Sequence, residues 1–106
     1  REPYYDLAEF YYEQEDFLKS AVTFEEMLKI DNRYLNYMSS PKCWGSLPYD
    51  FLSYCYYKLG DNQKALDNVI KALSFGEDER LENNKKYFEM LIKESAKLKQ
   101  KSQKNG

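Results

Sequence analysis

The 106-residue chain contains no histidine and only two cysteines, and these scarcities exclude several kinds of chemistry. Without histidine, the chain cannot build a serine–histidine or cysteine–histidine catalytic pair. A zinc site needs three or four converging ligands, and Cys43 and Cys55 supply only two thiolates. We therefore expect no catalytic residue, no metal site and no cofactor in this chain, and we expect both cysteines to be reduced.

Motifs for phosphate and nucleotide-sugar binding are also missing, as is any long apolar run. The chain has no G-x-x-x-x-G-K, G-x-G-x-x-G or D-x-D motif, so no phosphate cradle is expected. No apolar run approaches the roughly 18 residues of a membrane span, and no secretory signal is present. Because the chain opens on Arg1 rather than Met, we expect a piece of a longer, cytoplasmic protein without a membrane partner.

The net charge of −2 is unevenly distributed along the chain. Residues 1–34 carry a net charge of −5, whereas residues 93–106 carry +4. Nucleic-acid binding needs a folded basic face, so the acidic body argues against nucleic acid as a partner. We expect the lysine-rich end to fray after about Lys97 and residues 102–106 to form a disordered tail.

An internal repeat organises the chain. When the sequence is shifted by 45 residues, eight identities appear between residues 1–30 and 46–75. The matches fall at three- and four-residue steps, which is helical spacing. Each copy is therefore predicted to be two amphipathic helices joined by a turn. The matched pairs are Pro3/Pro48, Tyr4/Tyr49, Leu7/Leu52, Tyr11/Tyr56, Tyr12/Tyr57, Asp16/Asp61, Lys19/Lys64 and Leu28/Leu73.

Turn-forming residues support the same division. Pro3 and Pro48 suit the first turn of a helix, where a missing N–H group loses no hydrogen bond. Gly60 suits a left-handed position after a helix, and Asp16 and Asp61 can cap the helices that follow. The predicted helices cover residues 3–14, 17–30, 47–59, 62–75 and 79–101.

Both copies resemble the 34-residue tetratricopeptide repeat, whose pattern is W-x2-L-G-x2-Y followed by A-x3-F. The first copy reads Tyr4-x2-Leu7-Ala8-x2-Tyr11, and the second reads Tyr49-x2-Leu52-Ser53-x2-Tyr56. The resemblance implies an all-α, tetratricopeptide-type α-solenoid of two helix-turn-helix repeats and a C-terminal capping helix. The single domain of residues 1–101 then comprises repeat one (1–34), an insert (35–45), repeat two (46–79) and the capping helix (79–101).

Two positions in this alignment give specific structural predictions. Glu15 stands where the repeat has glycine, so we expect a positive φ there. Glu15→Gly should then be neutral or stabilising by roughly 0.4–1 kcal/mol. Trp44, the single tryptophan, is predicted to pack over the junction between the two copies, and the sequence leaves open whether its ring faces inward or outward.

The resemblance also implies where a partner would bind. In tetratricopeptide domains the first helix of each repeat lines a concave groove, and tyrosine suits recognition because it combines apolar area with a hydroxyl group. We expect a protein or peptide partner that is extended, and basic or proline-containing. The alternative is that the tyrosines only cover the core, and a homodimer also remains open. The predicted groove residues are Tyr5, Glu9, Tyr12, Glu13, Asp50, Tyr54, Tyr57 and Lys58.

Two narrower resemblances imply different functions. Residues 43–49 and 83–88 are similar to the repeat region C-terminal to the catalytic domain of bacterial nucleotide-sugar glycosyltransferases. That origin implies a non-catalytic, acceptor-orienting or dimer-forming domain whose parent holds the donor and metal elsewhere. Residues 50–54 and the Tyr87-Phe88 pair resemble the peptide-substrate-binding domain of collagen prolyl 4-hydroxylase. That origin implies an endoplasmic-reticulum module for proline-rich chains, and a self-standing adaptor is the third hypothesis.

Overall fold

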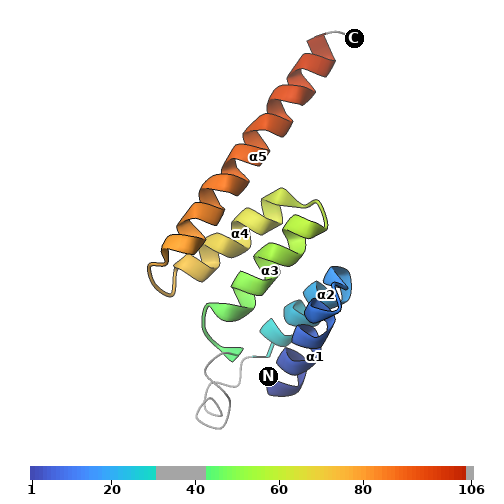
Figure 1. Ribbon diagram of the computed structural model, residues 1–106, viewed down its shortest axis with the longest axis vertical. Coiled ribbons are helices and arrows are strands. Elements are labelled where there is room, and N and C mark those ends of the chain that lie inside the picture. The colour runs from blue at the N-terminus through green and yellow to red at the C-terminus, as the bar shows by residue number, and fades with distance from the viewer. Residues whose placement is uncertain (31–42, 105–106) are drawn as a thin grey trace.

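The computed structural model describes residues 1–30 and 43–104, with side chains over residues 1–30 and 43–98. These ranges contain helices and no strand. In Figure 1 the helices are stacked in chain order, and the last helix extends well beyond the others. The predicted all-α helical-repeat architecture is confirmed. The helices are α1 (Glu2–Glu13), α2 (Phe17–Leu28), α3 (Leu47–Lys58), α4 (Asn62–Leu73) and α5 (Glu79–Lys104).

The helix starts follow the signals in the sequence. Both α1 and α3 carry proline in their first turn, at Pro3 and Pro48. The Asp16 carboxylate accepts a hydrogen bond from the Lys19 backbone N–H at 3.2 Å, and Asp61 accepts one from Lys64 at 3.0 Å. Each aspartate therefore caps the second helix of its copy, as predicted.

The two mid-copy turns share one geometry. Glu15 has a φ of 60° and Gly60 a φ of 86°, so both residues occupy the left-handed region. After each turn a backbone N–H reaches back into the preceding helix, from Asp16 to Tyr11 at 2.9 Å and from Asp61 to Tyr56 at 2.8 Å. The prediction that Glu15 replaces a turn glycine is confirmed.

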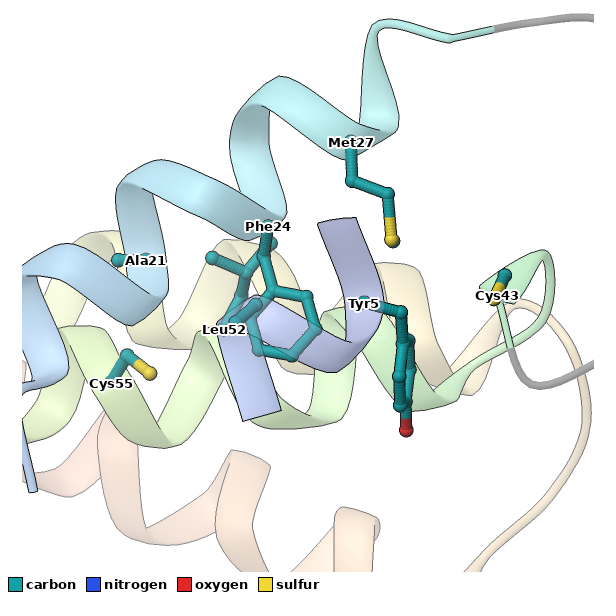
Figure 2. Packing of buried hydrophobic residues seen from close by; sticks show 8 residues of the cluster. Tyr5, Ala21, Phe24, Met27, Cys43, Leu52 and Cys55 are labelled. Atoms are coloured by element: carbon teal, nitrogen blue, oxygen red, sulfur yellow. The ribbon is translucent and has the colours of Figure 1, made fainter. Parts of the chain in front are cut away.

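Each helix packs against the next in the chain, and the resulting core has two parts. The first cluster joins α1, α2 and α3 around Tyr5, Phe24 and Leu52, with several of its buried members drawn in Figure 2. The second cluster joins α4 and α5 around Val69 and Phe88. Small residues such as Ala8 and Ser53 are buried where helices approach closely, and large side chains fill the remaining space.

Trp44 packs against the first cluster, which contains residues of both copies. The ring is half-buried, and the Arg1 guanidinium lies 3.8 Å from its centroid. Arg1 also donates hydrogen bonds to the carbonyls of Leu28, Ile30 and Cys43. One face of the indole therefore takes part in the junction between the copies, while the ring as a whole is only partly covered.

The last helix differs from the prediction. Because α5 continues to Lys104, its end is not at residue 101 and residues 102–104 are not a disordered tail. The physical reason is composition: from Glu79 to Lys104 the chain contains no glycine or proline and is rich in lysine, glutamate and leucine, which favour helix. Most of the predicted insert, residues 35–42, lies outside the described residues. Among the residues that are described, no helix is long and apolar enough to cross a membrane.

Candidate peptide-binding face

Tyrosine rings from three helices form one continuous surface. Tyr12 of α1 meets Tyr54 of α3 with ring centroids 5.7 Å apart, Tyr54 meets Tyr57 at 6.1 Å, and Tyr57 meets Tyr87 of α5 at 5.9 Å. Tyr54 and Tyr87 are 38% and 43% exposed, and the other two rings are half-buried. We call Tyr12, Tyr54, Tyr57 and Tyr87 the tyrosine face.

Phenylalanine rings beneath the tyrosine face hold it in place. Tyr12 contacts Phe51 edge-on at 4.8 Å and Phe17 at 5.6 Å. Tyr57 contacts Phe88 of the second core cluster at 5.7 Å. Because these rings also pack against the core, the orientation of each tyrosine is fixed before any partner binds.

An ion pair ties the start of α5 to α3 beside this surface. The two terminal guanidinium nitrogens of Arg80 both donate hydrogen bonds to the Asp50 carboxylate. Nη1 lies 3.3 Å from Oδ1, and Nη2 contacts Oδ2. Asn84 follows Arg80 by one turn and Tyr87 follows Asn84 by three residues, so the three share one stripe of α5. Because the two ends of this stripe contact α3, the half-buried Asn84 also lies toward the tyrosine face.

Two phenol groups of this surface, those of Tyr12 and Tyr87, have a raised pKa. Burial, together with the charges of Cys55, Tyr54 and Asp50, raises the pKa of Tyr12 to about 12. The Tyr57 and Tyr87 hydroxyl oxygens lie 3.4 Å apart, and this contact raises the pKa of Tyr87. A protonated phenol can donate a hydrogen bond to a carbonyl oxygen, so the face combines flat apolar rings with donors.

The predicted groove residues separate into two groups. Tyr5 is a correction, because it is 1% exposed and packs edge-on against Phe24 and Phe51 in the core. The buried side of α1 runs through Tyr5 and Ala8, whereas the repeat pattern predicts that it begins at Tyr4, one position earlier. The seven other predicted residues are at least partly accessible, and these are Glu9, Tyr12, Glu13, Asp50, Tyr54, Tyr57 and Lys58.

Sequence reasoning missed Tyr87 and Arg80. Their side chains meet α3 residues 30 positions away in the chain, and no local pattern gives such contacts. The available signal was the spacing of Arg80, Asn84 and Tyr87 along one helical stripe. The sequence predicts a capping helix at residues 79–101, whereas this side of α5 continues the surface formed by the first helices of the two copies.

Comparison with protein families decides between the resemblances. The model of the prolyl 4-hydroxylase peptide-substrate-binding domain matches residues 2–94. The chain belongs to this family. The match spans α1 to α4 and the part of α5 that carries Tyr87. The chain is therefore a tetratricopeptide-like domain of a peptide-binding family, which is not a catalytic family, and the resemblance to prolyl 4-hydroxylase is confirmed at this level.

No curated protein and no solved structure gives a significant match to the chain. The family match does not support the glycosyltransferase origin, which stays a prediction together with the cytoplasmic and bacterial assignments. Within this peptide-substrate-binding family the partner is a peptide or protein segment, so the coarser prediction about the partner is confirmed.

Proposed function

We propose that this domain binds an extended, proline-containing peptide segment on the tyrosine face and presents it to another part of a longer protein. The observation that carries the proposal is the row of four tyrosine rings in contact across α1, α3 and α5. The family supports it, because its description names a peptide substrate.

The spacing of the rings suits a polyproline II segment. Such a helix rises about 3.1 Å per residue and has three residues per turn, so each centroid step of 5.7 to 6.1 Å spans about two residues, and the rings contact more than one side of the helix. The three steps together match a segment of about six residues. Pyrrolidine rings can lie flat on tyrosine rings, and a preformed polyproline II helix loses little entropy when it binds.

Polar groups of the same surface suit the peptide backbone. A polyproline II segment makes no internal hydrogen bonds, so its carbonyl oxygens need donors. The Tyr57 and Tyr87 hydroxyls contact each other, which leaves one O–H for a peptide carbonyl, and the Asn84 side chain supplies a further donor on α5. The domain itself needs no cofactor for this role, and any chemistry on the peptide belongs to the parent protein.

The test is a titration of the domain with a nine-residue proline-rich peptide, followed by NMR of the tyrosine side chains and by calorimetry. Tyr54→Ala should weaken binding roughly threefold to tenfold, because aromatic contacts of this kind contribute about 0.5–1.5 kcal/mol beyond area burial. Tyr4→Ala is the matched control, since Tyr4 is similarly exposed, at 44%, and lies outside the tyrosine face. Absence of shifts at Tyr54, Tyr57 and Tyr87 with millimolar peptide would contradict the proposal.

A further inference from the structure

The α1 edge of the tyrosine face carries two carboxylates. Glu9 and Glu13 lie one helical turn apart, with Glu9 three residues before Tyr12 in the sequence and Glu13 one residue after it. Burial is the main cause that raises the pKa of Tyr5 to about 12, and the Glu9 charge, four residues further along α1, contributes. Within residues 1–30 and 43–98, neither glutamate takes part in an ion pair.

Two other charged groups beside the tyrosine face already have partners. Asp50 is paired with Arg80. The Lys58 ammonium lies 5.6 Å from the centroid of the Tyr54 ring, a distance at which a cation is attracted to the face of an aromatic ring. Two carboxylates without an ion-pair partner among the described residues therefore lie at the α1 edge, and a single further carboxylate, Glu94, contributes, after the Tyr57 hydroxyl, to the raised pKa of Tyr87 at the α5 edge. The Lys58 contact also shows that a ring of this face accepts a cation.

We infer that the peptide bound on the tyrosine face carries an arginine or lysine that pairs with Glu9 and Glu13 at the α1 edge. This inference rests on the proposed function and adds the register of the peptide to it. A guanidinium group can bridge two carboxylates one turn apart while its flat side lies against the neighbouring Tyr12 ring. The peptide is then a mixed proline-rich and basic segment, with the basic residue at the end that lies over α1.

The experiment compares three nine-residue peptides that share a proline-rich middle. One peptide is neutral, one has arginine at its first position and one has arginine at its last position. We expect one of the two arginine peptides to bind roughly threefold to tenfold tighter than the neutral peptide at low salt, which is the range for one or two exposed charge pairs. The gain should shrink in high salt, because screening weakens exposed pairs.

Charge-removing variants assign the effect to the two carboxylates. Glu9→Gln combined with Glu13→Gln should abolish the gain from arginine while leaving the affinity for the neutral peptide unchanged. Glu82→Gln combined with Glu89→Gln removes the same charge from exposed positions on α5 and should keep the gain. Glutamine and glutamate have similar helix propensities, so circular dichroism should show folded protein in both cases.

The outcomes separate this inference from the proposed function. Equal affinity for the neutral and both arginine peptides would overturn the inference and leave the tyrosine face as the peptide site. A gain that persists in the Glu9/Glu13 variant would also overturn it. Failure of all three peptides to bind would instead contradict the proposed function itself.

Discussion

Replacing Glu15 with glycine should leave the domain equally stable or make it more stable, although most substitutions destabilise proteins. Glu15 holds a φ of 60°, where a side chain crowds the backbone, and Gly60 holds the equivalent turn of the second copy at a φ of 86°. The two positions lie 45 residues apart, the same shift that aligns the copies. The experiment therefore tests both the strain and the repeat alignment.

Two opposing effects set the magnitude. A residue with a side chain in the left-handed region costs roughly 1–2 kcal/mol, which Glu15→Gly removes. Glycine also makes the unfolded chain more flexible, which lowers stability by about 0.4–1 kcal/mol. The net change is between about zero and 1.6 kcal/mol of stabilisation. For a domain near 100 residues, 1 kcal/mol corresponds to roughly 4–8 °C in Tm.

Thermal and urea unfolding monitored by circular dichroism measure this change, and two variants act as controls. Gln14→Gly adds glycine one position earlier, where φ is −79°, and should destabilise by about 0.5–1 kcal/mol because there is no strain to relieve. Gly60→Ala should lower stability by about 1 kcal/mol, although a Cβ there meets no atom within 4 Å. A Tm loss in Glu15→Gly as large as that in Gln14→Gly would refute the strain argument.

Two further predictions concern the junction and the buried phenols. Trp44→Ala should cost about 2–3 kcal/mol in urea unfolding, less than full burial would give, because the ring is only half-buried. Trp44→Phe should cost much less, since the buried indole N–H has no hydrogen-bond partner among the residues that the structure describes, and phenylalanine removes that group. Burial raises the pKa of Tyr5 and Tyr12 to about 12, above their ordinary value near 10. The stability from these phenols should therefore be complete below about pH 10 and be lost as pH rises toward 12, which urea unfolding at a series of pH values would measure.

Local features of the fold were predictable because their causes are local in sequence. A helix cap depends on an aspartate three residues before an unpaired backbone N–H, so Asp16 and Asp61 could be placed from the sequence. The left-handed turn depends on one residue just before that aspartate, so Glu15 and Gly60 could be placed in the same way. Helices α2 and α4 each end two residues earlier than predicted, at Leu28 and Leu73. Such shifts are expected where no glycine or proline marks the last turn.

The candidate site was less predictable because it depends on contacts between distant segments. The helical pattern put Tyr5 and Tyr12 on similar sides of α1, but packing buries Tyr5 against Phe24 and leaves Tyr12 at the surface. The two residues are seven positions apart, so they share one side of α1 but lie about 10 Å apart along its axis, where neighbouring helices cover them to different degrees. Tyr87 was missed for a related reason, because it joins the site only through its contact with Tyr57.

The tyrosine face and the core share side chains, which explains how a nearly flat surface can recognise a peptide. Phe51 stacks on Phe24 at 5.4 Å inside the first cluster and meets Tyr12 at 4.8 Å on the face. Phe88 is buried in the second cluster and meets Tyr57. The rings are therefore held by the same packing that stabilises the fold, so a partner does not have to order them when it binds. Since the face crosses α1, α3 and α5, it exists only when both copies and the last helix are stacked, and a single repeat could not form it.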